Sequence, residues 1–331
     1  MKPILLGIFS AFFFAFTFVF NRAMELDGGS WMWSASLRYF FVILLLGIIV
    51  AARKNPRAVF IEMKTAPGHW LLWSFVGFGL FYAPLTFASS FAPGWLIAST
   101  WQITIISGSL LAPLFIEKIQ QNDGTFIKRK GCIPWKGLGF SSLILFGVMI
   151  MQAEHASSLS LKEALLCIIP MVIASFAYPL GNRKMMEVCD NRLDAYQRVL
   201  GMSIASLPVW LILAIIAFFT VGAPSSNQVF QSGLVALFSG VAATVLFFMA
   251  TDLVRNNMEK LGAVEATQSL EVLFAVIGEV FLLASTGPSL ISWIGMVLVT
   301  GGMVLHSYMS TSLNPNQKIQ QSHTTPTKAE K

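Results

Sequence analysis

Ten long apolar runs, separated by short polar connections, divide this sequence. The runs cover approximately 3–22, 33–52, 69–88, 95–116, 135–152, 161–181, 198–220, 229–251, 264–285 and 289–309. About 20 consecutive apolar residues are enough to cross the hydrocarbon core of a bilayer as a helix. Charged residues make up 11% of the chain, whereas a soluble domain carries roughly 25%. We therefore expect an all-α integral membrane protein with ten transmembrane helices.

Basic residues gather in alternate connections between these runs. Nineteen of the 22 Lys and Arg residues lie at the N-terminus, at the second, fourth, sixth and eighth connections, or in the tail. The third, seventh and ninth connections contain none. The positive-inside rule then predicts a plasma membrane protein with both termini in the cytoplasm. The net charge of +6 follows from this topology, so the Lys128-Arg129-Lys130 cluster predicts a cytoplasmic loop and not a nucleic-acid partner.

One short string occurs twice, as N-R-x-M, then nine or ten intervening residues, then A-x-x-R. The first copy comprises Asn21-Arg22-Ala23-Met24 with Ala35 and Arg38, and the second comprises Asn182-Arg183-Lys184-Met185 with Ala195 and Arg198. Five apolar runs lie in each half, and an odd number of spans inverts the second copy relative to the first. We expect two inverted five-helix repeats, 1–157 and 158–310, and a disordered tail, 311–331. Such duplication is common in secondary transporters, whose substrate site lies near the midplane between the repeats.

These features resemble the ten-helix, EamA-like branch of the drug/metabolite transporter superfamily. Members of that branch carry an Arg at the start of the second helix of each repeat, matched here by Arg38 and Arg198. The stretch from Gly262 to Glu279, GAVEATQSLEVLFAVIGE, is similar more narrowly to the multidrug-resistance efflux members. The resemblance covers about 1–310 and implies export of small organic molecules. Four-helix pumps of the same superfamily use a Glu in their first helix, but the run 3–22 contains no acidic residue.

Two polar helix faces are the candidate substrate or ion site. Residues 268, 271, 272, 275 and 279 fall on one face of the ninth run at helical spacing. The repeat offset of 168 maps this face onto residues 100, 103, 104, 107 and 111 of the fourth run. The resulting candidates are Glu271, Glu279, Gln268, Arg38, Thr100, Trp101, Gln102, Thr104 and Ser107. Hydrogen bonding between helices is the alternative role of the three hydroxyl residues.

The depth of each charged residue in its apolar run predicts whether its side chain pairs with another charge or reaches water. Arg38 and Glu279 lie at similar depth near the outer end, so we expect them to form an ion pair that a cation or proton can break. Arg198 and Glu265 lie near the cytoplasmic end, where we expect their side chains to reach water. Both Asn-Arg dipeptides of the doubled string are expected to cap helix ends.

Sequence motifs exclude several other functions. The chain has no nucleotide-binding G-x-x-x-x-G-K-[ST] motif and no H-E-x-x-H motif, and its histidines lack metal-binding spacing. We expect neither an enzyme nor a bound cofactor or metal. The predicted function is proton-coupled antiport of a small organic molecule, with Glu271 or Glu279 binding either a proton or a cation. The alternatives are an exchanger or exporter of an anionic or zwitterionic metabolite, and a scaffold or channel. Membrane lipid is the other expected partner, and the oligomeric state stays open.

Overall fold

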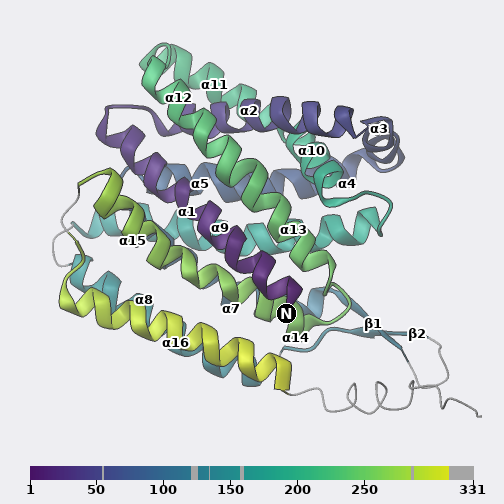
Figure 1. Ribbon diagram of the computed structural model, residues 1–331. Coiled ribbons are helices and arrows are strands. Elements are labelled where there is room, and N and C mark those ends of the chain that lie inside the picture. The colour runs from purple at the N-terminus through teal and green to yellow at the C-terminus, as the bar shows by residue number, and fades with distance from the viewer. Residues whose placement is uncertain (54–55, 121–125, 134, 157–159, 285–286, 313–331) are drawn as a thin grey trace, which may run out of the picture.

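The computed structural model describes residues 1–53, 56–120, 126–133, 135–156, 160–284 and 287–312, which form a helical bundle with one short hairpin (Figure 1). The elements up to residue 156 are α1 Lys2–Leu26, α2 Trp31–Ala52, α3 Pro56–Thr65, α4 Pro67–Ser74, the π-helix η1 Phe75–Gly79, α5 Leu80–Ala88, α6 Gly94–Trp101, α7 Ile103–Leu110, the 3-10 helix η2 Ala112–Leu114, β1 Ile116–Gln120, β2 Phe126–Lys130 and α8 Trp135–Ala156. The later elements are α9 Leu161–Cys189, α10 Ala195–Ala205, α11 Leu207–Val221, α12 Ser226–Val235, the π-helix η3 Ala236–Ala243, α13 Thr244–Asp252, α14 Met258–Ala266, the 3-10 helix η4 Thr267–Ser269, α15 Leu270–Leu282 and α16 Leu290–Ser312.

Within the described ranges, six helices are long and apolar enough to cross a membrane, which makes this an integral membrane protein. They are Lys2–Leu26, Trp31–Ala52, Pro67–Ala88, Leu161–Cys189, Ser226–Asp252 and Lys260–Leu282. A seventh span is obtained if α10 and α11, bent by 47° at their junction, are counted as one. Ser141–Glu154 and Leu290–Gly302 are shorter apolar helices. The predicted run 95–116 is helical but interrupted, because α6 ends before Gln102 and α7 begins after it.

Several helices begin where the sequence supplies a cap. The Ser160 hydroxyl accepts from the Glu163 amide at 3.3 Å, and the Glu163 carboxylate accepts from the Ser160 amide at 2.9 Å, which starts α9. Asp194 and Gln197 form the same reciprocal pair at the start of α10. Each pair satisfies two backbone donors that a helix N-terminus leaves unpaired. These caps fix where the polar connections turn back into the bundle.

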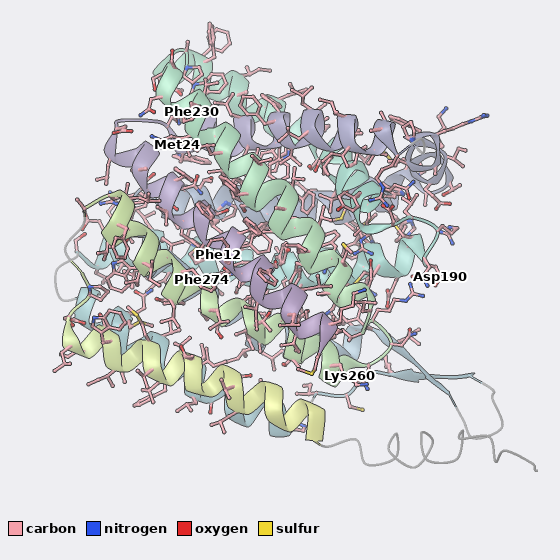
Figure 2. The ribbon with its side chains drawn as sticks, in the orientation of Figure 1. Phe12, Met24, Asp190, Phe230, Lys260 and Phe274 are labelled. Carbon is pink, nitrogen blue, oxygen red and sulfur yellow. The ribbon has the colours of Figure 1, made fainter. Side chains whose placement is uncertain are left out.

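The helix ends collect at two opposite ends of the bundle. Met24 and Phe230 lie at one end and Asp190 and Lys260 at the other (Figure 2). The hairpin of β1 and β2 projects at the Lys260 end (Figure 1), with Ile116 paired to Lys130. The rest of the described chain is helical, as expected; only these hairpin residues differ from their expected place in a helix end and a loop. Of the predicted tail, 313–331 lie outside the described residues, and 311–312 end α16.

Glycines allow two close contacts between helix backbones. α8 and α16 lie side by side (Figure 1), and the Gly295 carbonyl occupies the space that a Cβ on Gly147 would need. A Cβ on Gly181 of α9 would overlap the backbone of Gly77 in η1. Small residues let membrane helices approach in this way. The second contact joins the two predicted repeats directly.

Candidate functional site

A buried carboxylate on α15 is the starting point of the site. Glu271 is 1% exposed, and neither of its oxygen atoms has a hydrogen-bond partner among the described residues. It belongs to the first turn of α15, immediately after the 3-10 turn η4. An acidic side chain inside a membrane span is costly and is a functional candidate by default. The structure therefore isolates Glu271 at a place where a bound cation or proton would satisfy it.

A tyrosine within electrostatic range of this carboxylate belongs to a group of packed aromatic rings. Tyr178 of α9 lies within electrostatic range of Glu271, and its hydroxyl also lacks a hydrogen-bond partner in the described chain. The Tyr178 ring centroid is 4.6 Å from that of Phe81, 5.6 Å from that of Trp101, 5.7 Å from that of Phe247 and 6.4 Å from that of Phe14. We call these five rings the aromatic cluster. Ring faces attract cations, so the cluster and Glu271 offer complementary chemistry to a positive group.

Arg38 brings a buried positive charge to the same region. Its guanidinium, on a residue 2% exposed, lies 3.8 Å from the Tyr82 ring centroid and donates from Nη2 to the Ser239 hydroxyl at 3.1 Å. Its Nε and Nη1 atoms have no hydrogen-bond partner among the described residues. Tyr178 lies within electrostatic range of both Arg38 and Glu271. The positive charge of Arg38 and the carboxylate of Glu271 therefore both act on Tyr178.

The predicted ion pair between Arg38 and Glu279 is absent. Glu279 instead accepts a hydrogen bond from the Gly94 amide at 2.6 Å, at the start of α6. Helix N-termini bind anions because their amides are unpaired and the helix dipole is positive there. Similar depth along two helices did not bring the residues together, because Arg38 turns toward the Tyr82 ring and the η3 segment.

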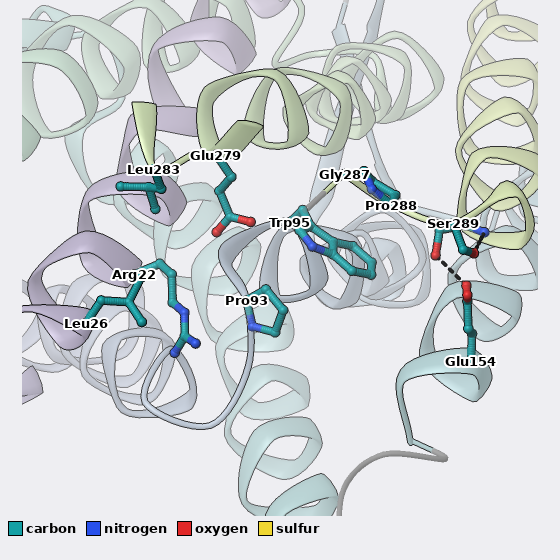
Figure 3. Close-up of a pocket in the computed structure, with 11 residues that line it drawn as sticks. Arg22, Leu26, Pro93, Trp95, Glu154, Glu279, Leu283, Gly287, Pro288 and Ser289 are labelled. Carbon is teal, nitrogen blue, oxygen red and sulfur yellow. Dashed lines mark hydrogen bonds between the residues drawn. The ribbon is translucent and has the colours of Figure 1, made fainter. Parts of the chain in front are cut away.

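Glu279 lines a cavity of about 530 Å³ that we call the Glu279 pocket (Figure 3). Its wall consists of Arg22, Leu26, Pro93, Trp95, Glu154, Glu279, Leu283, Gly287, Pro288, Ser289 and Ser292. Glu154 accepts a hydrogen bond from the Ser292 hydroxyl at 2.6 Å. Sequence reasoning missed Arg22, Trp95 and Glu154 as site residues. An acidic residue at the end of the apolar run 135–152 was the available signal for Glu154.

The polar face of the fourth run bonds neighbouring helices. The Thr104 hydroxyl donates to the Ser175 carbonyl at 3.1 Å, and the Ser107 hydroxyl lies 3.4 Å from that of Ser175. Thr100 receives a hydrogen bond from the Gln152 amide. This geometry matches the alternative role of these residues as contacts between helices.

Two glutamine side chains join helices by hydrogen bonds, one between the fourth and ninth runs and one between the ninth run and α1. Gln102 donates to the Gln268 carbonyl at 3.2 Å, while its own Oε1 has no partner among the described residues. Gln268 donates to the Gly7 carbonyl at 3.3 Å. Gln102, which follows Trp101 in the chain, therefore keeps one unpartnered acceptor, whereas Gln268 ties η4 to α1.

A buried ion pair lies at the Lys260 end. Arg183 donates from Nε and Nη2 to the two Glu265 oxygens at 3.1 and 2.6 Å, and from Nη1 to the Gly108 carbonyl at 2.6 Å. The expectation that Glu265 reaches water was wrong, because Arg183 compensates its charge inside the bundle. Arg198 is also buried, paired with Asp252 at 2.6 Å and lying over the Phe248 ring. Its expected exposure was wrong for the same reason.

The doubled Asn-Arg dipeptides do not cap helices as expected. Asn21 lies inside α1 and donates to the Tyr82 hydroxyl at 3.2 Å. Asn182 is buried inside α9, where both its polar side-chain atoms lack partners among the described residues. The helices run on past both dipeptides, so neither asparagine stands at a helix end.

Residues 1–312 match the model of the EmrE family, described as "Putative multidrug resistance efflux transporter". The chain belongs to this family. Membership implies membrane transport of small molecules and no enzymatic reaction.

Curated relatives extend over most of the chain. "Uncharacterized protein YjlA" of Bacillus subtilis (strain 168) is 52% identical over 320 residues, which are 97% of this chain and 98% of the relative. "Uncharacterized 42.1 kDa protein in intracellular alkaline protease 3'region" of Shouchella clausii is 48% identical over 271 residues, 82% of this chain and 70% of the relative. A solved crystal structure has a similar fold, with a TM-score of 0.64 and 12% sequence identity. The match covers 94% of the present chain and 98% of the chain in that crystal structure.

Proposed function

We propose that the protein is a secondary transporter that exports small organic cations by alternating access in exchange for protons. The observation that carries this proposal is the Glu271 carboxylate, buried without a hydrogen-bond partner beside the aromatic cluster. Membership of a multidrug efflux family supports it. The absence of a nucleotide-binding motif favours an ion gradient as the energy source.

The proposed architecture is ten transmembrane helices in two inverted repeats, 1–157 and 158–310, with both termini in the cytoplasm. The position of the site supports it, since Phe14, Phe81 and Trp101 come from the first range, and Tyr178, Phe247 and Glu271 come from the second. The π-helices η1 and η3 also occupy the third span of each range. π-helical turns are frequent at functional sites. Transporters with inverted repeats bind substrate at such an interface.

Exchange follows from the chemistry of one carboxylate. An ionised carboxylate in a low-dielectric interior needs a counter-charge, and an organic cation seated against the aromatic rings supplies it. A proton on the same carboxylate removes the charge and therefore the need for the cation. Because Glu271 binds one or the other, the empty ionised form is disfavoured, and each reorientation carries a cation or a proton.

A solute with both charges is the second candidate substrate class. The observation that favours it is that Arg38 and Glu271 both lie within electrostatic range of Tyr178, with two guanidinium nitrogens unpartnered in the described chain. A zwitterion would place its anionic group on Arg38 and its amine on Glu271. Arg38→Gln separates the two substrate classes, because it lowers flux of a zwitterion strongly and flux of a simple cation weakly.

The test is flux in proteoliposomes with an imposed pH gradient. Purified protein is assayed with a panel of fluorescent organic cations and zwitterions of matched size. We expect Glu271→Gln to abolish gradient-driven flux, because the amide cannot exchange a proton at this position. Glu187→Gln is the matched control, since Glu187 is exposed and paired with Lys184. Gradient-driven flux that survives in Glu271→Gln would contradict the coupling role.

A further inference from the structure

We propose that Arg22 and Arg183, the arginines of the two N-R-x-M strings, close opposite ends of the transport path by pairing in turn with Glu279 and Glu265. This inference rests on the alternating-access function proposed above. In the described structure the Arg183 pair is formed and the Arg22 pair is not. In this state the end of the transport path that contains Glu265 is therefore closed, and the end that contains Glu279 is open.

The closed end is built around Arg183. Its side chain and that of Glu265 are 4% and 5% exposed, and two hydrogen bonds join them. A third bond reaches the Gly108 carbonyl, so the pair links α9 and α14 to α7. Gly108 permits this contact, because a Cβ there would overlap the Glu265 carboxylate. We call this arrangement the inner clasp.

The open end contains the same two residue types without the bond. Arg22 and Glu279 both line the Glu279 pocket (Figure 3) and lie within electrostatic range of each other. No ion pair within 4.0 Å joins these two described residues. Glu279 is instead held by the Gly94 amide. Arg22 is thus a cation that can reach Glu279 when the pocket narrows.

The two glutamates occupy matched positions on one pair of antiparallel segments. Glu265 and Glu279 are separated by 14 residues along α14 and α15, and their contacts Gly108 and Gly94 are separated by 14 residues along α6 and α7. At 1.5 Å per helical residue this spacing is about 21 Å. Glu271 lies between the two glutamates, so each end contact is placed to close one side of the central site.

The doubled N-R-x-M string places Arg22 and Arg183 where they can pair with their glutamates in turn. Arg22 follows Asn21 near the end of α1, and Arg183 follows Asn182 near the end of α9. In an inverted duplication these equivalent positions lie at opposite ends of the bundle. A rocking motion that separates Arg183 from Glu265 narrows the other end and brings Arg22 to Glu279. Each pair stabilises the state in which its own end is closed.

Accessibility of an engineered cysteine tests the proposal without requiring transport. Leu283 lines the Glu279 pocket and is half-buried, so Leu283→Cys reports whether that end is open. Intact cells are treated with a membrane-impermeant maleimide in a Cys132→Ser background, since Cys167 and Cys189 are buried. Ser226→Cys is the matched control, because Ser226 is exposed at the start of α12 and does not line the Glu279 pocket.

We expect Glu265→Gln to slow labelling of Leu283→Cys several-fold by weakening the inner clasp. Adding Arg22→Gln restores fast labelling, because the other end can no longer close. Exchanging the charges with Arg183→Glu and Glu265→Arg returns the parent rate. Ser226→Cys, which lies outside the pocket, labels equally in every background, which shows that each variant is folded and inserted.

An unchanged labelling rate in Glu265→Gln would overturn the proposal. So would a combined Arg22→Gln and Glu265→Gln variant that labels as slowly as Glu265→Gln alone. These results are distinguishable from failure of the proposed function. Persistent gradient-driven flux in Glu271→Gln rejects the coupling site and leaves the labelling pattern intact, whereas unchanged labelling with normal flux rejects only the alternating pairs.

Discussion

The Gly94 amide donates to the Glu279 carboxylate across 2.6 Å, so the start of α6 is joined to the end of α15. Gly94 is suited to this contact for a second reason. A Cβ at this position would lie 2.5 Å from the Phe18 carbonyl and 2.6 Å from the Glu279 carboxylate. Three helices therefore meet at a point that accepts only glycine without rearrangement.

Gly94→Ala should destabilise the protein. The added methyl must displace the backbone of α1 or the Glu279 side chain, and such overpacking typically costs about 1–3 kcal/mol. Thermal unfolding in detergent followed by intrinsic fluorescence measures the change. Gly47→Ala in α2 is the matched control, because no atom lies within 4 Å of its added Cβ. Equal melting temperatures for the two variants would show that the Gly94 contact relaxes freely.

Glu271→Gln should leave the melting temperature unchanged or raise it. The substitution removes a carboxylate that has no hydrogen-bond partner among the described residues, so no native contact is lost. Glu265→Gln should lower stability by about 3 kcal/mol, because it leaves the buried Arg183 charge without a counter-ion. The two isosteric changes lie six residues apart and are compared in one unfolding series. A marked loss of stability in Glu271→Gln would indicate a structural role for this carboxylate.

Tyr82 should stabilise Arg38 through its ring more than through its hydroxyl. The guanidinium lies 3.8 Å from the ring centroid, and a desolvated cation–π contact contributes roughly 2 kcal/mol. Tyr82→Phe keeps this contact and loses the hydrogen bond from Asn21, whereas Tyr82→Leu loses both. We expect Tyr82→Leu to unfold at clearly lower denaturant concentration than Tyr82→Phe. The reverse order would assign the stabilisation to the hydroxyl.

The pair of Arg192 and Glu62 should contribute little. Both Glu62 oxygens lie 3.0 Å from Arg192 Nε, but the arginine side chain is largely exposed and water screens the pair. The Glu62 carboxylate raises the pKa of Arg192 above its ordinary value. A raised arginine pKa gives a contribution that is complete below the unfolded pKa and is lost only as pH rises through the folded pKa. Arg192→Gln should therefore change neither the melting temperature nor its dependence on pH between about 5 and 9.

The lengths of the apolar runs predicted the positions of most helices. A helix inside a bilayer must form its backbone hydrogen bonds internally and needs a long apolar segment to cross it. The run lengths also selected Glu271, since burial of that carboxylate follows from its place in such a run. Run length did not reveal partners. Glu265 and Arg183 are separated by 82 residues in sequence, and only the packing of α9 against α7 and the position of α14 brings them together.

Side-chain direction accounts for the other differences. Arg38 and Glu279 have suitable depths, but the guanidinium lies over Tyr82 while the carboxylate lies at the Gly94 amide. Depth specifies one coordinate of a residue in a membrane, and the rotation of its helix specifies the other. Similarly, Trp95 and Glu154 meet in one pocket because separate helix ends converge there, and no single periodic face contains both.

The contact between Gly77 and Gly181 has a consequence for motion. Because neither residue has a side chain, the two backbones meet without an interlocked rotamer on either helix. Core packing elsewhere resists displacement because side chains interdigitate and must change rotamers together. At this crossing the two glycines contribute no side chain that would have to change rotamer if one helix turned over the other. The two glycines thus form a fixed point of contact about which the flanking segments can pivot, with the η1 turn at its centre.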